Sequence, residues 1–337
     1  MAGIRTERNN SIDIFRFICA LLVIAIHTNL ATEINLYLGY FCSQILPRVA
    51  VPFFFCVSGY FYIKKLNRAA GKRELIKIFR STFLSYLKIY VFWSIVYMVC
   101  DYKQYFYEGV SAKGIIVGIV LNFFVYGSYY HLWYFIGIFF SLIIVTGCYL
   151  IRAEKILAYF SVILYLAGVL GCAYYQIGNK IPLFSILISN SHFTLIRRNL
   201  LMAVPFFMMG YFLTKISDRK ILIKVVLTGV LFVGEIVVVN MLGLNVNIIE
   251  TIFLYIFLAY IMVWLLNHPL QEEKRIGEIC RYLASFVYFS HPLFIMIITY
   301  IGINKNTVVF LLSAILSIAI GLILLNINNK TLNQFIS

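Results

Sequence analysis

Ten apolar runs divide this chain, each close to the length that an α-helix needs to cross a lipid bilayer. A span takes about 20 apolar residues, at a rise of about 1.5 Å per residue. The runs cover residues 12–30, 44–63, 80–100, 130–150, 155–174, 200–214, 221–241, 248–267, 281–301 and 307–326. The pattern therefore predicts a single all-α membrane domain over residues 1–337, a polytopic bundle of about ten transmembrane helices. Several runs are short, which predicts tilted or partly buried helices.

Two stretches between the runs follow other patterns. Residues 113–127 are apolar but short and contain Gly114, Gly118 and Asn122, which predicts an interfacial or re-entrant helix in an outer loop. Residues 175–198 are polar and are predicted to be irregular. We find no internal repeat or low-complexity tract, and we expect no appended soluble domain.

The first run carries three ionisable side chains where a simple anchor would have leucine. An arginine at mid-helix costs roughly 2.5–3.5 kcal/mol on insertion scales. Arg16 and His27 are separated by about three helical turns, which places them on one face about 16 Å apart. Asp13, one turn before Arg16, lies within reach of it. The alternative is that Arg16 only extends to the headgroups and His27 is a satisfied interior group, but the shared face favours a functional pair.

Composition supports a membrane protein and limits its partners. Of the 337 residues, 62% are hydrophobic and 12% are charged, whereas soluble domains have about 45–50% and about 25%. No small-residue cleavage site follows the first run, so we expect an uncleaved helix. Basic cytoplasmic loops explain the net charge of +15, and no nucleic-acid partner is expected. The seven cysteines lack CxxC spacing, so we expect neither disulfides nor a metal site.

The distribution of basic residues among the loops predicts the orientation of the chain. Residues 64–80 contain seven Lys or Arg residues and one acid, Glu74. Alternate loops on the other side carry fewer basic residues. Because basic loops stay in the cytoplasm, both termini are predicted to be cytoplasmic. This topology places Arg16 near the cytoplasmic end of the first span and His27 in its outer third.

Two further spans begin with candidate groups on the predicted outer side. Arg48 enters the second span before Pro52, which is expected to interrupt the helical hydrogen bonds and leave carbonyls free to line a cavity. The alternative is a kink beside an extended arginine. His131 opens the fourth span among aromatic residues that alone are typical of the interfacial belt. Since His27 is predicted at a similar depth, we expect His27 and His131 to line one cavity.

Later spans contain more polar groups. Glu235 lies near the middle of the seventh span and is expected to face a cavity or a cation. Glu250 opens the eighth span and is expected to be a boundary residue. His291 precedes Pro292, which removes one amide donor, so His291 either caps freed backbone groups or contributes to a site. The candidate cationic partners of Glu235 are Arg16, Arg48, Arg197 and Arg198.

These groups lie in motifs that resemble one family, although the sequence has no P-loop, GxSxG, HExxH or glycine-rich dinucleotide motif. DIFRFICALLVIAIH (13–27) is similar to the first-helix signature of the acyltransferase-3 family of integral membrane transacylases. RVAVPFFFCVSGYF (48–61), HLWYF (131–135) and HPLF (291–294) resemble further landmarks of that family, in the expected order. Within the family, RRNLLMAVPFFMMGYF (197–212) and Glu235 look most like the membrane domain of the membrane serine racemases of vancomycin resistance.

The resemblance implies a multi-pass O-acyltransferase of the bacterial inner membrane. It would take an acyl group, such as acetyl, from a cytoplasmic acyl-CoA and transfer it to a hydroxyl acceptor, often a cell-envelope glycan. His27 is the candidate general base, and Arg16 would bind donor phosphates. His131 is a further candidate catalytic residue. The candidate binding residues are Asp13, Arg48, Arg197, Arg198, Glu235 and His291.

The runner-up is an L-serine transporter, as the racemase subgroup implies. In that interpretation an arginine holds the serine carboxylate and Glu235 holds the ammonium group. A structural or sensory module is a third interpretation, which several ionisable side chains within the spans argue against. We expect no metal cofactor, with membrane lipids as partners, and the sequence leaves the oligomeric state open, a homodimer included.

Overall fold

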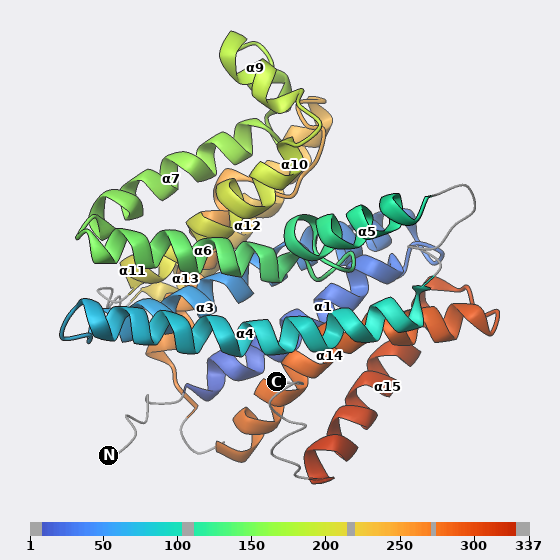
Figure 1. The fold of residues 1–337 in the computed structure, drawn as a ribbon. Helices are drawn as coiled ribbons and strands as arrows, with labels where there is room; N and C mark the ends of the chain where they lie inside the picture. Colours follow the sequence, from blue (N-terminus) through green and yellow to red (C-terminus); the bar gives the residue numbers. More distant parts are fainter. Residues whose placement is uncertain (1–8, 103–110, 214–219, 271–273, 328–337) are drawn as a thin grey trace. The chain divides into compact units, whose positions relative to one another are not determined.

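A computed structural model of the protein describes residues 9–102, 111–213, 220–270 and 274–327. These residues form helices joined by turns, without any strand in the described ranges (Figure 1). They divide into two compact units. Unit 1 comprises Met1–Phe53, Ile216–Thr228 and Phe257–Ser337, and unit 2 comprises Phe54–Lys215 and Gly229–Ile256.

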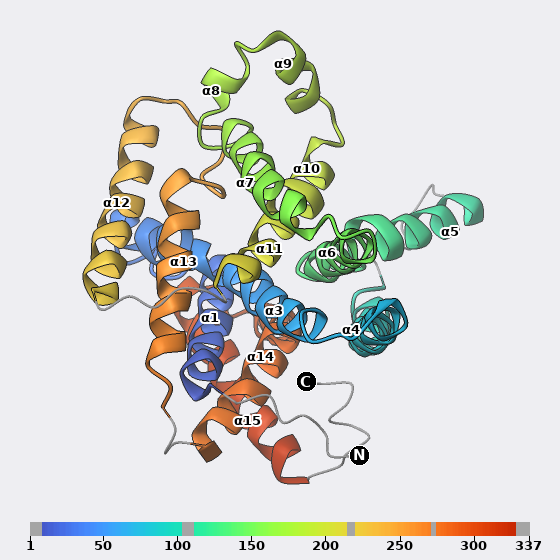
Figure 2. The ribbon, with the colours of Figure 1, turned by 90° about the vertical axis from the view of Figure 1, so that its left-hand side faces the viewer.

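Unit 1 is built on three long helices that lie side by side in both views (Figures 1 and 2): α1 (Asn10–Thr28), α14 (Lys274–Tyr300) and α15 (Asn306–Ile327). Helices α1 and α14 run parallel. Near their starts, Gly277 of α14 packs so tightly on Asn10 that a Cβ atom would overlap it. Near their ends, the rings of His27 and His291 meet. The two helices therefore stay in contact along nearly the whole length of α1.

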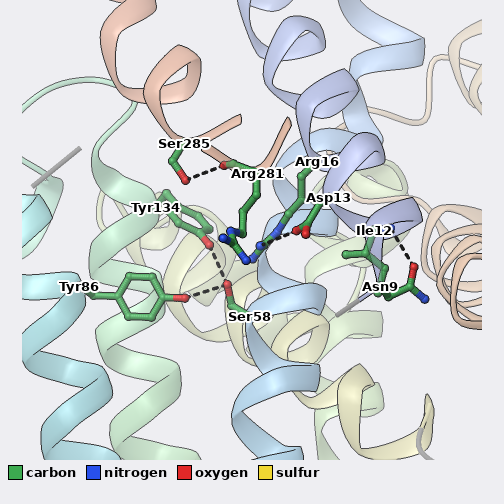
Figure 3. Close-up of polar contacts among 9 residues, drawn as sticks. All are labelled: Asn9, Ile12, Asp13, Arg16, Ser58, Tyr86, Tyr134, Arg281 and Ser285. Atoms are coloured by element: carbon green, nitrogen blue, oxygen red, sulfur yellow. Dashed lines mark hydrogen bonds and ion pairs between the residues drawn. The ribbon is translucent and has the colours of Figure 1, made fainter. Parts of the chain in front are cut away.

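The polar residues at the start of α1 fix that helix to the end of α13 (Ile252–Asn267). The side chains of Asn9, Asn10 and Ser11 donate hydrogen bonds of 2.5 to 2.8 Å to the carbonyls of Leu265, Leu270 and His268. Asn9 also caps α1, because its Oδ1 accepts from the amide of Ile12 at 3.3 Å (Figure 3). These contacts satisfy groups that helix ends otherwise leave without partners.

The predicted second span is interrupted before Pro52 and not at it. It consists of four consecutive helical segments: α2 (Leu36–Tyr40), the π-helical η1 (Phe41–Ile45), the 3₁₀-helical η2 (Leu46–Val49) and α3 (Ala50–Leu66). Pro52 lies in the first turn of α3 and supplies no N–H to the turn that precedes it. The irregular backbone lies before Pro52, in η1 and η2, and the expectation that Pro52 leaves carbonyls free to line a cavity remains a prediction.

Unit 2 contains most of α3 and the helices α4 (Lys72–Cys100), α5 (Ala112–Leu121), η4 (Asn122–Tyr126), α6 (Trp133–Leu150), α7 (Glu154–Leu170), α8 (Tyr175–Gly178), α9 (Pro182–Ile188), α10 (Phe193–Ile196), η5 (Arg197–Ala203) and α11 (Val204–Leu213). Helices α3 and α11 cross at Gly59 and Gly210. A Cβ atom on Gly59 would overlap the carbonyl of Phe207, and one on Gly210 would overlap the backbone of Tyr60. Only glycine allows this approach.

Each of the ten predicted runs contains a helix, but fewer helices have the length and apolar character needed to cross a membrane. Among the described residues, seven helices have the length and apolar character to cross a membrane: Asn10–Thr28, Leu36–Leu66, Lys72–Cys100, Trp133–Leu150, Ile221–Met241, Arg275–Tyr300 and Asn306–Ile327. Ala112–Tyr126 and Ile252–Asn267 are shorter apolar helices. The count of ten spans remains a prediction, as does the side on which the termini lie, since residues 1–8 and 328–337 are outside the described ranges.

The stretch 175–198 is more regular than predicted. It contains the short helices α8, α9 and α10. Pro182 starts α9, and the Asn190 side chain accepts from the amide of His192 at 2.8 Å between α9 and α10. Ile188 and Phe193 are buried together with Leu201 of η5, so apolar side chains among the polar ones hold this stretch in helical turns.

Candidate functional site

Charged residues gather near the starts of α1 and α14 in unit 1. Arg16 Nη1 lies 3.6 Å from Asp13 Oδ1, as their spacing of one turn predicts. Arg281 of α14 also points toward this pair (Figure 3), and the Ser285 hydroxyl lies 3.5 Å from the Arg281 carbonyl. Two guanidinium groups and one carboxylate therefore lie at one level of the α1–α14 interface, which leaves an excess of one positive charge among these three groups.

A stacked histidine pair lies at the other end of the same interface. The rings of His27 and His291 are 5.3 Å apart between centroids and 23° from parallel. His291 is fully buried, and its Nδ1 lies 2.7 Å from the carbonyl of Tyr288 and 3.1 Å from that of Val287. A carbonyl can only accept, so Nδ1 carries the hydrogen and Nε2 of the neutral ring is an acceptor.

The cause of this arrangement is Pro292. In a regular helix, the amide of residue 292 would donate to the carbonyl of Tyr288. Pro292 has no N–H, and His291 Nδ1 donates to that carbonyl instead. The capping role predicted for His291 is thus confirmed, and it also fixes the tautomer of the ring.

The distance between the arginine level and the histidine level is similar along α1 and along α14. From Arg16 to His27 the rise along α1 is about 16 Å, and from Arg281 to His291 the rise along α14 is about 15 Å. Since α1 and α14 run parallel, the same interface presents arginines at one level and histidines at the other. The sequence alone did not indicate Arg281, which resembles any basic loop residue.

His131 lies in an aromatic surrounding in unit 2. Its side chain is buried and makes edge-on contacts with the rings of Tyr97, Tyr129 and Tyr130, at centroid distances of 5.1, 5.9 and 5.6 Å. His27 belongs to unit 1. The cavity shared by His27 and His131 therefore remains a prediction.

Hydroxyl groups from three helices meet next to the HLWYF and SGYF motifs in unit 2. Ser58 Oγ of α3 lies 3.1 Å from the hydroxyl of Tyr134 of α6, and Tyr86 of α4 donates to Ser58 at 3.1 Å (Figure 3). Tyr134 and Ser58 are buried. The two motifs thus contact each other through a chain of hydroxyls, which can pass or hold a proton.

Arg48 is held within its own segment. Its Nε donates to the Gln44 carbonyl at 2.8 Å, and its Nη2 donates to Gln44 Oε1 at 2.6 Å. Both residues lie in the irregular stretch η1–η2 of unit 1. These bonds orient the guanidinium group across the π-helical turn.

Glu235 caps a helix in unit 2. Its Oε1 accepts from the amide of Ile252 and its Oε2 from the amide of Phe253, both at 2.8 Å. The Tyr174 hydroxyl adds a third hydrogen bond at 2.9 Å. A carboxylate at a helix N-terminus satisfies free amides and matches the helix dipole. These contacts account for the mid-span carboxylate without any of the arginines that the sequence suggested as its partner.

Arg197 of unit 2 has a carboxylate partner, Glu250. Arg197 Nη1 lies 2.6 Å from Glu250 Oε1, and Glu250 is fully buried. Glu250 lies two residues before the start of α13, and its place in a buried ion pair was not predicted. Arg198 instead makes a cation–π contact with Trp133, and its guanidinium carbon lies 5.2 Å from the ring centroid. The sequence signal for this ion pair was the presence of two adjacent arginines before an apolar run, because arginines in such a position need a counter-charge from another part of the chain.

Comparison with known proteins agrees with the resemblance seen in the motifs. The model of the acyltransferase domain of the acyltransferase-3 family matches residues 9–326. The chain is 29% identical over 344 residues to an amino-acid racemase of Enterococcus faecalis, covering 96% of this chain and 47% of that protein. It is 25% identical over 292 residues to a serine/alanine racemase of Enterococcus gallinarum, covering 85% and 40%. No solved structure matches the chain.

The chain spans less than half the length of these curated relatives, so their names describe longer proteins. The family match, in contrast, extends from the start of α1 to the end of α15 and includes the first-helix, SGYF, HLWYF and HPLF motifs. Together with the long apolar helices, it identifies a membrane protein. The chain belongs to the acyltransferase-3 family.

Proposed function

We propose that the protein is an integral membrane O-acyltransferase of the bacterial inner membrane. It transfers an acyl group, such as acetyl, from a cytoplasmic acyl-CoA to the hydroxyl of an acceptor, a cell-envelope glycan in the simplest case. Family membership supports the reaction class. The single observation that carries the proposal is the pair of polar levels, arginine and histidine, on the α1–α14 interface.

The histidine level supplies the proton chemistry. His27 takes the proton of the acceptor hydroxyl while the hydroxyl oxygen forms a bond to the thioester carbonyl carbon. The carbon–sulfur bond then breaks, and the imidazolium returns the proton to the leaving thiolate. His291 stacks on His27, and its Nε2, fixed as an acceptor, receives a hydrogen bond from a hydroxyl of the acceptor.

The arginine level holds the donor. Guanidinium groups bind phosphate oxygens through paired N–H groups, and Arg16 and Arg281 offer two of them at one height. Asp13 orients Arg16. The separation of about 16 Å along α1 is too long for both levels to touch one atom, but it suits an extended donor with phosphates at one end and a thioester at the other.

L-Serine transport is the second candidate, and the name of one relative, a serine/alanine racemase, fits it in part. These relatives are an amino-acid racemase and a serine/alanine racemase, and this chain matches less than half of each. A transporter would use the same buried charges without chemistry. Glu235 is poorly suited to hold the serine ammonium group, because three hydrogen bonds already occupy its oxygens.

One experiment separates the two functions. The purified full chain is reconstituted in liposomes and tested for release of thiol from acetyl-CoA in the presence of hydroxyl acceptors, and for flux of labelled serine. The enzyme requires thioester consumption that depends on acceptor. Serine flux without thioester consumption would replace the acyltransferase by a transporter.

A further inference from the structure

Unit 2 contains a charged cluster of its own. It joins the π-helical segment η5 to the residues just before α13. Arg197 and Glu250 form its buried ion pair at 2.6 Å, and the thiol of Cys172 lies beside both. The Tyr165 hydroxyl also donates to the carbonyl of Thr251 at 2.7 Å.

The charges in this cluster do not balance. Arg198 follows Arg197 and lies within electrostatic reach of both Arg197 and Glu250. Two guanidinium groups thus share one carboxylate. One face of Arg198 contacts Trp133, but within the described part of the chain its N–H groups have neither an ion-pair nor a hydrogen-bond partner. A partly buried cation in this state needs an anion or water.

The cluster also contains buried polar atoms that lack a hydrogen-bond partner among the described residues. Glu250 and Thr251 are both fully buried. Among the residues that the structure describes, Glu250 Oε2 and Thr251 Oγ1 have no hydrogen-bond partner. Buried polar atoms are nearly always paired with protein, water or ligand. Next to the unbalanced cation there is therefore an acceptor oxygen that can receive a donor group.

We propose that Arg198, Glu250 and Thr251 form a binding site for a small hydroxylated carboxylate. The planar guanidinium group of Arg198 binds the carboxylate through two N–H groups, and Glu250 Oε2 accepts from a hydroxyl of the same molecule. The carboxylate of such a molecule adds one negative charge next to two guanidinium groups, whereas a zwitterion such as serine adds no net charge. This assignment names the acceptor class and in that respect rests on the proposed acyltransferase function.

Three molecules with the same three-carbon skeleton test the site in the full chain in detergent: glycerate, serine and glycerol. Their binding is measured by calorimetry without any acyl donor. We expect glycerate to bind about 10- to 100-fold more tightly than glycerol, as one charged hydrogen-bonded contact predicts, and more tightly than serine. Arg198→Gln should remove this advantage, and Arg198→Lys, which keeps the charge without the planar fork, should retain part of it.

Arg198 is only partly buried, so Arg198→Gln is expected to fold, and size-exclusion chromatography checks this. Lys180→Gln, an exposed change in the same unit, is the matched control and should bind glycerate like the wild type. Equal binding of glycerate and glycerol, tighter binding of serine, or glycerate binding that survives Arg198→Gln would each overturn the site. Binding of glycerate through Arg198, together with no acceptor-dependent thiol release from acetyl-CoA in the liposome assay, would keep the site and reject the acyltransferase.

Discussion

At the scale of single residues, Pro292 decides the chemistry of its neighbour. By lacking an N–H, it leaves the Tyr288 carbonyl to His291 Nδ1, at 2.7 Å. Free histidine is not restricted in this way, since either ring nitrogen of the neutral form can carry the hydrogen. The proline therefore acts on the histidine pair through the tautomer of one ring.

This tautomer is observable by ¹⁵N NMR of histidine-labelled protein, because the chain has five histidines and His291→Gln assigns the signal. We expect Nδ1 of His291 to be protonated and Nε2 to be unprotonated. Pro292→Ala returns an amide donor to the Tyr288 carbonyl, so the ring should populate both tautomers, and acyl transfer should fall by about 10-fold through loss of orientation. An Nε2-protonated His291 in the wild type would contradict this assignment.

Residue contacts within one helix were predictable, and contacts between distant segments were not. The pair of Asp13 and Arg16 follows from helical spacing, and the cap by His291 follows from its position before Pro292. The pair of Arg197 and Glu250 joins residues that local periodicity cannot bring together. Composition showed that buried arginines need a counter-charge, but only the fold identifies it.

At the scale of elements, α3 and α11 depend on glycine where they cross. The string AVPFF occurs at the start of α3, at 50–54, and across the start of α11, at 203–207. In both places the string GYF follows it, at 59–61 and 210–212. Their glycines lie against the backbone of the opposite helix. The close approach allows backbone packing of the kind that small residues provide between membrane helices.

Gly59→Ala should separate α3 from α11. Its Cβ atom would meet the Phe207 carbonyl, which cannot move as a side-chain end can, so we expect a loss of about 1–3 kcal/mol or more in stability. Gly147→Ala on α6 is the control, because nothing lies within 4 Å of its new Cβ atom and alanine favours helix by up to about 1 kcal/mol. Thermal unfolding in detergent measures both. A Gly59→Ala protein as stable as the wild type would reject the close crossing.

The loop after α1 caps α15. Glu33 Oε1 accepts from the amide of Thr307 at 2.6 Å, and Asn306 Nδ2 donates to Thr32 Oγ1 at 2.6 Å. The bond from the Thr307 amide lowers the pKa of Glu33 below its ordinary value of 4.5. A carboxylate with a depressed pKa stabilises the fold above its unfolded pKa, and this contribution is lost as pH falls through the folded one.

The Thr307 amide should therefore be better protected from hydrogen exchange in the wild type than in Glu33→Gln at neutral pH. The difference should shrink only at a pH below the ordinary range of a glutamate, as pH falls through the lowered pKa of Glu33 and the wild-type side chain becomes neutral as well. Exchange is compared between the two proteins at each pH, which removes the intrinsic pH dependence. A difference that shrinks already above the ordinary range of a glutamate, or that does not change with pH down to acid unfolding, would rule out the carboxylate as the cause.

The helical elements themselves were largely predictable, but their irregular turns were not. Apolar runs of span length give α1, α4, α6, α12 (Ile221–Met241), α14 and α15 close to the predicted residues. The π-helical segments η1 and η5, which carry or precede candidate arginines, have no signature in hydrophobic periodicity. Hydrogen-bond choice within a helix depends on tertiary contacts that a single run does not encode.

At the scale of the whole molecule, the proposed mechanism depends on which side of the membrane the arginine level and the histidine level face. The basic loop 64–80 predicts a cytoplasmic location for that loop and for both termini. The exposed Arg68, between α3 and α4, reports on this loop, and the exposed Lys113, in α5, reports on the predicted outer side.

In a chain without its native cysteines, Arg68→Cys should resist a membrane-impermeant thiol reagent added to intact cells, whereas Lys113→Cys should react. Permeabilised cells should label both. Labelling of Arg68→Cys from outside intact cells would invert the topology, and the arginine level could then no longer receive a cytoplasmic donor.

The central claim is that His27 removes a proton during acyl transfer, and His27→Gln tests it most directly. Glutamine keeps approximate volume and a hydrogen-bonding group but cannot act as a base. In liposomes with acetyl-CoA and acceptor, we expect transfer to fall by about 10²–10⁴-fold, while donor binding stays near the wild-type value and weakens instead in Arg16→Lys. Acyl transfer that survives His27→Gln at the wild-type rate would contradict the account.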